Sequence, residues 1–395
     1  MKRTYNEFVD NGLFVASYLL NKEIEDITEQ DILDNKELFI DKLLEFVSCE
    51  NLHSIGTMLF FNSPLMNPRS KNKHKEKTLE FFNMLEETLI DDNKTTCFCC
   101  EEKRVSPSIC KISTVSSSVN PLLPANTFYN FSNNLHMVNI CPICLILSML
   151  SLLNTLKFGI NYLIISDNDD FMKDYTKQTQ YQNSMYIESD GAIKNNKKIF
   201  DFLYEMFDEE GYKDIYNCGY IGILRYNNSK GNNEIENLII NKKYIDLIKK
   251  LKKVKLYNEF KEKKLIQFIL NNKLEYVYLS YLVDFNKEEF RCSYDLIEFL
   301  NKELNNLDNK IKKLIEDICF EVYKINGKKS IMELKNIKYL GAFESLLLEW
   351  KEKCNKEIFN KDDFELLTNH MQYKKIINFM ICELLTLRNK ENGGK

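Results

Sequence analysis

Proline is scarce in this sequence, and its distribution limits the fold. All six prolines lie between Pro64 and Pro142, so nothing after residue 142 carries the residue that most often ends a helix. We therefore expect long helices in the last two thirds of the chain.

Histidine is also scarce, and this limits the catalytic chemistry. The chain has only His53, His74, His136 and His370, and no His-Glu-x-x-His pattern of a zinc protease. A zinc deaminase pattern is absent too, because His136 lacks the required glutamate two residues on. We predict a non-catalytic protein. The acidic clusters 167–170 and 208–210 leave one alternative, a metal-dependent nuclease, because two-metal sites need only well-placed carboxylates.

Long apolar runs are missing. The most apolar stretch, residues 140–153, is too short for a membrane span, which needs about 20 residues. Polar residues follow the basic start, where a signal peptide would have an apolar core. We expect a cytoplasmic protein without membrane contact, whose 12 cysteines are reduced thiols or metal ligands. The net charge of −4 means that any nucleic-acid contact must come from local basic patches.

Apolar residues recur at helical spacing over most of the chain. The spacing predicts helices over residues 5–20, 28–43, 78–89, 242–271, 293–323 and 364–388, and a buried helix beginning near residue 145. Thr28 and Asp31 form a capping-box pattern at the start of the second helix. Residues 161–166 read as a strand, 166–198 as a polar surface insertion, and 219–225 with 235–240 as a β-hairpin.

These elements predict an α+β fold that is predominantly helical. We expect an N-terminal α/β region with a four-cysteine zinc knuckle, a middle β-hairpin and a C-terminal helical bundle. The predicted domains are an N-terminal helical region (1–95), a zinc-knuckle module (96–160), a mixed middle region (161–241) and a C-terminal helical region (242–395).

Two Cys-x-x-Cys pairs are the strongest chemical signal. Cys97 and Cys100 form the first, and Cys141 and Cys144 form the second, just before the apolar helix. Two such pairs can supply the four thiolates of a tetrahedral zinc site, and four protein ligands leave no open position for a substrate. The prediction is a structural zinc ion. Three residues remain alternative ligands: Cys99, Cys110 and His136.

Lysines and amides form several candidate contacts for nucleic acid. A lysine-rich amphipathic helix is expected over residues 242–264, where it could follow a phosphate backbone or present a solvated face. Short amides at the hairpin tip could reach phosphates or base edges, or make a plain turn. The candidates are Lys194, Lys197, Lys198, Arg225, Asn228, Lys230, Asn232, Lys249, Lys250, Lys252 and Lys253.

Several segments together resemble one known family, the large subunit of type I-B CRISPR Cascade. The two cysteine pairs are the most specific part. The start of the chain (residues 4–12, TYNEFVDNG) also resembles that family, as do the segments 58–68, 128–131 and 224–233. The resemblance covers roughly the first 240 residues in patches, and the remainder matches only as a helical region.

This resemblance implies a function. Such subunits are non-catalytic, contact the 5′ end of the guide RNA, recognise the motif flanking a double-stranded DNA target, and help recruit a helicase-nuclease. The expected partners are therefore guide RNA, target DNA, the other Cascade subunits and the helicase-nuclease. A third reading is a zinc-stabilised scaffold without nucleic-acid contact.

Overall fold

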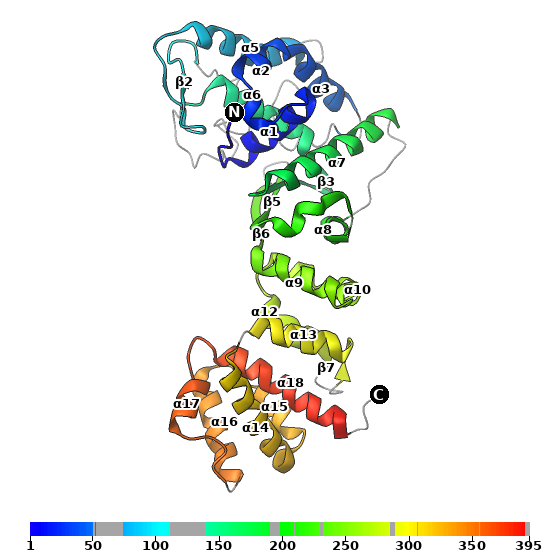
Figure 1. The fold of residues 1–395 in the computed structure, drawn as a ribbon, viewed down its shortest axis with the longest axis vertical. Coiled ribbons are helices and arrows are strands. Elements are labelled where there is room, and N and C mark those ends of the chain that lie inside the picture. The colour runs from blue at the N-terminus through cyan, green and yellow to red at the C-terminus, as the bar shows by residue number, and fades with distance from the viewer. Residues whose placement is uncertain are drawn as a thin grey trace. The chain divides into compact units, whose positions relative to one another are not determined.

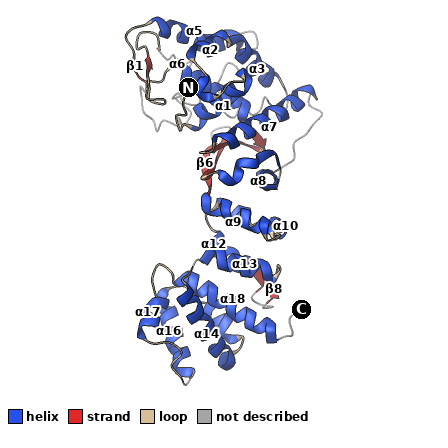
Figure 2. Cartoon of the chain, viewed as in Figure 1, coloured by secondary structure: helices blue, strands red, loops and turns tan. Residues whose placement is uncertain are grey.

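The computed structural model divides into two compact units, unit 1 (Met1–Asp246) and unit 2 (Leu247–Lys395) (Figure 1). It describes residues 1–49, 52, 74–110, 139–189, 198–208, 210–229, 232–284, 289–305, 307–354 and 356–391. Helices dominate, with small antiparallel sheets between them (Figure 2), so the predicted helix-rich α+β class is confirmed. The four predicted domains stay a prediction.

Unit 1 contains helices and all of the larger sheet. Its helical elements are α1 (Glu7–Leu20), η1 (Ile24–Asp26), α2 (Glu29–Asp34), α3 (Lys36–Ser48), α5 (His74–Ile90), α6 (Pro142–Leu150), η5 (Ser151–Asn154), α7 (Asp169–Glu188), α8 (Ile199–Asp208) and η6 (Glu210–Asn217). Its strands are β1 (Thr95–Thr96), β2 (Lys103–Val105), β3 (Leu156–Phe158), β4 (Ile160–Ser166), β5 (Tyr220–Ser229) and β6 (Asn232–Asn241). The capping box of Thr28 and Asp31 is confirmed at the start of α2.

The sheet of unit 1 has four antiparallel strands in the order β3-β4-β5-β6. The predicted strand at 161–166 is β4, and the predicted hairpin is formed by β5 and β6. Both hairpin strands are longer than the sequence pattern indicates, since pairing continues to Ser229 opposite Asn232. The added pairs include Asn227 with Glu234 and Asn228 with Asn233, so the ladder continues through polar residues.

Helix α6 forms the centre of unit 1. Every residue from Pro142 to Leu150 is buried, and α1 packs directly against it. The two backbones approach most closely at Gly12, where an added Cβ would lie 1.6 Å from the Leu147 carbonyl oxygen. Only glycine fits this crossing, because any side chain would enter the backbone of α6.

Charged groups are buried beside this crossing, in a set of contacts we call the polar anchor. The Asp10 carboxylate is fully buried and accepts hydrogen bonds from Arg3 Nε at 3.1 Å, the Thr4 amide at 2.7 Å and the Tyr5 amide at 3.1 Å. Arg3 continues to the Ser166 carbonyl oxygen at 2.6 Å and to Asp169 at 3.0 Å. The anchor thereby ties the start of α1 to the end of β4 and the start of α7.

Asparagines extend the polar anchor into the core. The Asn11 side chain donates to the Ile164 carbonyl oxygen at 3.0 Å, and Asn154 donates to Asn11 Oδ1 at 2.8 Å and to Thr176 Oγ1 at 3.0 Å. The amide nitrogens of both residues therefore have partners within the protein, as buried polar groups require.

The predicted surface insertion at 166–198 is wrong over most of its length. Residues 169–188 form α7, a helix of 20 residues whose inner face is buried. That face consists of Phe171, Met172, Tyr175 and polar residues such as Thr176 and Asn183, which bond to buried backbone and to the polar anchor. Its polar composition concealed the helix, because the expected apolar stripe is only partly present.

Unit 2 is almost entirely helical. Helix α9 (Lys242–Lys253) contains the division between the units. The remaining elements are α10 (Tyr257–Glu262), α11 (Ile266–Leu270), α12 (Leu274–Leu282), β7 (Val283–Asp284), β8 (Glu289–Phe290), α13 (Tyr294–Asn305), α14 (Asn309–Asn326), α15 (Lys329–Lys335), α16 (Leu340–Lys353), α17 (Lys361–Leu367) and α18 (Tyr373–Glu391).

The long helices predicted here are wrong in length. Residues 242–271 form three helices, because Lys255 and Lys264 adopt left-handed φ angles of 63° and 53° that end α9 and α10. The range 293–323 is broken before Asp308, which caps α14, and residues 361–391 form α17 and α18. Proline-free sequence therefore permits long helices without producing them.

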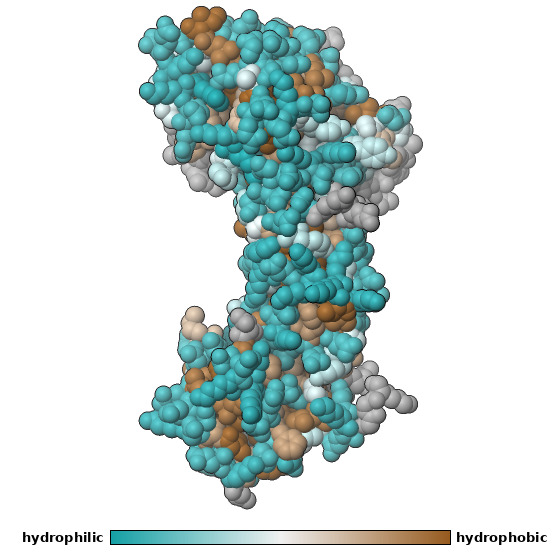
Figure 3. All heavy atoms as spheres, viewed as in Figure 1, coloured by the Kyte–Doolittle hydropathy of each residue, from teal (hydrophilic) through white to brown (hydrophobic). Residues whose placement is uncertain are grey.

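The surfaces of both units are mostly hydrophilic in the view of Figure 3, with apolar atoms in small separate patches. Large apolar side chains lie inside instead, for example Trp350 and Phe343 in unit 2. Among the helices that the structure describes, none has the length and apolar character needed to cross a membrane.

Candidate metal centre

The first cysteine pair sits on a tight turn between β1 and β2. The Cys97 amide donates to the Glu102 carbonyl oxygen at 2.8 Å, and the Glu101 amide donates to the Cys97 carbonyl oxygen at 3.0 Å. Glu101 closes the turn with a φ of 58°, a conformation that glycine adopts more easily. The turn directs Cys97 and Cys100 into the protein, where both are buried.

The second pair sits at the start of α6. Cys141 is the N-cap residue, Pro142 occupies the first turn, and the Cys144 amide donates to Cys141 Sγ at 3.5 Å. The two pairs are joined by the backbone, since the Phe98 amide donates to the Asn139 carbonyl oxygen at 2.8 Å. Helix N-termini stabilise negative charge, so this position favours thiolates.

The four sulfur atoms lie within 4.8 Å of one another and all four residues are buried. Cys97 Sγ is 3.9 Å from Cys144 Sγ, and Cys100 Sγ is 3.7 Å from Cys141 Sγ. A tetrahedral metal ion with metal–sulfur bonds of about 2.3 Å separates its sulfur ligands by roughly 3.8 Å. A disulfide would need about 2 Å. The four cysteines therefore fit a bound metal ion and have the spacing of ligands.

Electrostatics also favour a cation at this point. Hydrogen bonds from the Cys100 and Cys141 thiols lower the pKa of Cys97. Hydrogen bonds with Cys100 and Cys141, together with burial, raise the pKa of Cys144 well above its ordinary value. Four thiolates this close would also repel each other. The Cys141 amide donates to Cys97 Sγ at 3.2 Å and so adds one fixed positive dipole. Four thiolates can coexist here only with a cation between them.

The alternative ligands are not members of the cluster. Cys99 is half-buried and contacts Cys144 and Cys97, but it is not one of the four clustered cysteines. The Cys110 sulfur contacts Thr88 Oγ1 at 3.7 Å on α5. His136 lies outside the described residues.

Several candidate nucleic-acid contacts lie outside the described residues, namely Lys194, Lys197 and Lys230, together with the resembling segments 58–68 and 128–131. Lys198 is exposed just before α8. Arg225 is half-buried, and its Nη1 binds Glu236 at 2.7 Å. Asn228 and Asn232 lie on the hairpin strands next to its tip. The Arg225 guanidinium is thus engaged within the hairpin itself.

The α9 lysines occupy a partly exposed face. Lys249, Lys250 and Lys253 are exposed, while Tyr244, Ile248 and Leu251 of the same helix are buried. Lys250 Nζ binds Glu303 at 2.6 Å, and Lys252 Nζ lies 5.7 Å from the centre of the Tyr257 ring. The amphipathic pattern of this helix therefore has a buried apolar side and a lysine-bearing outer side.

The acidic cluster at 167–170 has structural partners. Asp167 accepts hydrogen bonds from the amides of Gly219 and Tyr220 at 2.8 and 3.2 Å, which joins the end of β4 to the start of β5. Asp169 binds Arg3 in the polar anchor. These carboxylates hold the fold together at the edge of the sheet.

Sequence reasoning did not assign a role to the start of the chain beyond its family resemblance. The structure gives Asp10, Asn11 and Gly12 specific contacts in the polar anchor and at the α1–α6 crossing. The signal in the sequence was the placement of Asp, Asn and Gly inside an otherwise apolar helix, where such residues are unfavourable without a partner.

Comparisons with known proteins returned no relative. No family model, no curated protein and no solved structure matches this chain.

Proposed function

We propose that this protein is the non-catalytic large subunit of a type I-B CRISPR Cascade complex, with a structural zinc ion held by Cys97, Cys100, Cys141 and Cys144. The supporting observation is the four-cysteine cluster: the two pairs most specific to the resemblance lie 41 to 47 residues apart in sequence, yet their sulfurs meet in the core of unit 1.

Zinc is the metal that tetrahedral sites of four thiolates most often hold. When bound, it would neutralise the thiolates and fix the turn after β1 to the start of α6, leaving no position for catalysis. The residues of this chain supply the rest of the centre: the Cys141 amide donates to Cys97 Sγ, and α6 directs its N-terminus at the sulfurs.

The proposed partners are guide RNA, target DNA and the other subunits of the complex. Pairing between the guide RNA and the DNA would supply sequence specificity, and the protein would read only the short flanking motif and the backbone. The exposed lysines of α9 offer the phosphate contacts for this task. A recruited helicase-nuclease would perform the cleavage.

The nuclease alternative has less support. A two-metal site needs carboxylates free to bind metal ions. Asp167 and Asp169 instead accept hydrogen bonds from backbone amides and from Arg3. Their substitution by asparagine would therefore destabilise unit 1 and would remove no cleavage activity.

The decisive experiment is affinity purification of the tagged protein from its native host, with sequencing of the bound RNA and identification of the bound proteins. We expect guide RNAs with a constant 5′ repeat tag together with other Cascade subunits. Recovery of the protein alone and free of RNA would overturn the proposal.

A second experiment tests the α9 lysines separately. A Lys249→Glu, Lys250→Glu, Lys253→Glu variant is expected to lose about tenfold or more in affinity for target DNA, with a smaller dependence on salt. The matched control is Lys310→Glu, Lys313→Glu, Lys361→Glu, which reverses three exposed lysines of unit 2 outside α9. Equal behaviour of the two variants would favour the zinc-stabilised scaffold.

A further inference from the structure

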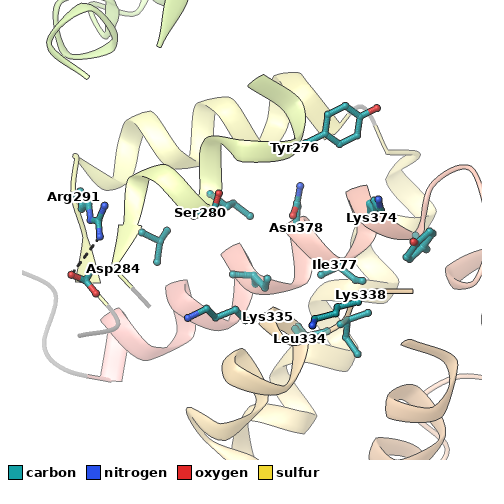
Figure 4. A pocket seen from close by; sticks show the side chains of 15 residues that line it. Tyr276, Ser280, Asp284, Arg291, Leu334, Lys335, Lys338, Lys374, Ile377 and Asn378 are labelled. Carbon is teal, nitrogen blue, oxygen red and sulfur yellow. Dashed lines mark ion pairs between the residues drawn. The ribbon is translucent and has the colours of Figure 1, made fainter. Parts of the chain in front are cut away.

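Unit 2 contains a cavity of about 650 Å³ that has no part in the function proposed above. The first turns of α18 form its floor, and α12 and the end of α15 form its walls (Figure 4). Pockets for small ligands and cofactors have volumes of about 300 to 1,000 Å³. This cavity is therefore large enough for a small organic ligand.

The wall of the cavity is apolar in part and strongly basic in part. Among the described residues, four cationic side chains and one carboxylate line it, with a summed charge of +3 (four minus one) at neutral pH; they are Arg291, Lys335, Lys338, Lys374 and Asp284. Apolar side chains lie between them: Leu279, Val283, Leu334, Ile337, Ile377 and Ile381. The lining thus suits an anion that carries an apolar or flat body.

The two ends of the cavity differ in chemistry. Lys338 and Lys374 lie at the end where Tyr276 also lies, and Arg291 and Asp284 lie at the opposite end (Figure 4). Lys338 and Lys374 are exposed, and no carboxylate of the described residues forms an ion pair with either. Two ammonium groups without a paired carboxylate make a phosphate-binding end, since lysine binds phosphate as a point charge.

The opposite end offers donors and an acceptor together. Arg291 Nη2 lies 3.6 Å from Asp284 Oδ2, longer than the 2.7 to 2.9 Å of a strong charge-assisted hydrogen bond. A guanidinium has five N–H donors and a carboxylate has about four acceptor positions, so both residues can bind a ligand in addition to their partners within the fold. Carboxylates accept from the amino groups of nucleobases, and arginine donates to their ring nitrogen and carbonyl acceptors. A ligand that is anionic throughout would be repelled by Asp284.

We infer that this cavity binds a mononucleotide, with the phosphate between Lys338 and Lys374 and the base edge at Asp284 and Arg291. The lining residues Lys374 and Ile381 are seven residues apart on α18, which corresponds to about 10 Å of helix. This length accommodates one nucleotide. The apolar side chains between the two ends cover the faces of the base and sugar.

The test is calorimetric titration of the full-length protein with AMP, GMP, CMP and UMP, and separately with inorganic phosphate and adenosine. We expect at least one mononucleotide to bind more tightly than inorganic phosphate and more tightly than adenosine. The Lys338→Glu, Lys374→Glu variant is expected to lose about tenfold or more in affinity, as expected when hydrogen bonds to a charged group are removed.

The control is the Lys313→Glu, Lys361→Glu variant, which makes the same change of charge on exposed positions of unit 2 outside the cavity. Circular dichroism of all variants verifies that they fold. Asp284→Asn is expected to alter the preference among the four nucleotides while leaving phosphate binding unchanged.

Four results would overturn the inference: no mononucleotide binding in the millimolar range, equal losses in the two lysine variants, inorganic phosphate binding as tightly as every nucleotide, or binding of a short single-stranded oligonucleotide without binding of mononucleotides. The last result would point to a strand-binding surface in place of a small-ligand site.

Discussion

The two units are stabilised in different ways. Unit 1 depends on a few specific devices: four clustered sulfurs, the glycine crossing of α1 and α6, and the buried charges of the polar anchor. Unit 2 depends mainly on apolar packing between helices, with α18 against α13, α14 and α15. Removal of one of these interactions should therefore lower the stability of unit 1 far more than a comparable substitution lowers the stability of unit 2.

The largest effect is expected from removal of the proposed zinc ion. Structural zinc sites contribute about 10 kcal/mol or more of apparent folding free energy in small domains. We expect a chelator, or Cys97→Ser or Cys144→Ser, to unfold unit 1 and make the protein insoluble. Elemental analysis and hydrogen exchange provide the measurement, with Cys99→Ser as the control that retains one metal ion per chain. A metal-free protein that stays soluble and keeps its full protection against hydrogen exchange would contradict this expectation.

The buried carboxylate of Asp10 tests the polar anchor. Asp10→Asn removes the buried one of the two carboxylates that bind Arg3 and leaves Asp169 as the other, so we expect a loss of about 3 kcal/mol, the lower end of the cost of breaking a buried ion pair. Asp317→Asn is the counterpart in unit 2, where the side chain is exposed and a change within about 0.5 kcal/mol is expected. Chemical denaturation of both variants gives the comparison. Similar losses would mean that the anchor is no more important than a surface charge.

Two glycines sharpen the comparison at the level of single atoms. Gly12→Ala places a methyl group 1.6 Å from the Leu147 carbonyl oxygen, so the α1–α6 crossing must move apart at a cost of about 3 kcal/mol. Gly341→Ala on α16 meets nothing closer than 3.8 Å and should stabilise that helix by up to about 1 kcal/mol. The measurement is the change in melting temperature of each variant relative to wild type. A change of the same sign for both variants would refute the close crossing.

The smallest effect concerns Glu383 on α18. Burial, followed by repulsion from Glu316, raises the pKa of this carboxyl. Because the pKa is raised in the folded state, the stabilisation of the folded protein by the protonated Glu383 carboxyl is fully present below the unfolded pKa of about 4.5. This stabilisation is lost as the pH rises through the pKa of the folded state. Glu383→Gln should therefore stabilise unit 2 at pH 7 and lose this advantage as the pH falls toward 4.5.

Melting temperatures measured between pH 7 and pH 4.5 check the Glu383 prediction. Exposed Glu365 on α17 supplies the control, because Glu365→Gln should show no such dependence on pH. A Glu383→Gln variant less stable than wild type at pH 7 would show that the carboxylate is not penalised by its surroundings.

Local patterns were enough to predict part of the fold. The capping box at Thr28, the strand at 161–166 and the hairpin were found because turn residues and alternation act over a few positions. The clustering of the four cysteines followed from their paired spacing, since each Cys-x-x-Cys turn can direct two sulfurs to one point.

The remaining features depend on contacts that no local pattern reveals. Helix α7 buries the polar residues Thr176 and Asn183, whose partners lie on η5, so the sequence of its inner face did not show an apolar stripe. Lys255 and Lys264 end helices in a left-handed conformation. Glycine is the usual residue at such a position, so a lysine there gives no sign in the sequence that a helix ends. The cavity of unit 2 combines residues from 276 to 381, and only the packing of three helices brings them together.

The polar anchor also determines when unit 1 can form during synthesis. Arg3 binds Asp169, and Asn11 binds Ile164, so the first helix meets partners made more than 150 residues later. At a synthesis rate of about 5 to 20 residues per second, Leu13 and Phe14 would be without their packing partners for roughly ten seconds or longer. During that interval the nascent N-terminus is an exposed apolar segment and a natural client for a chaperone.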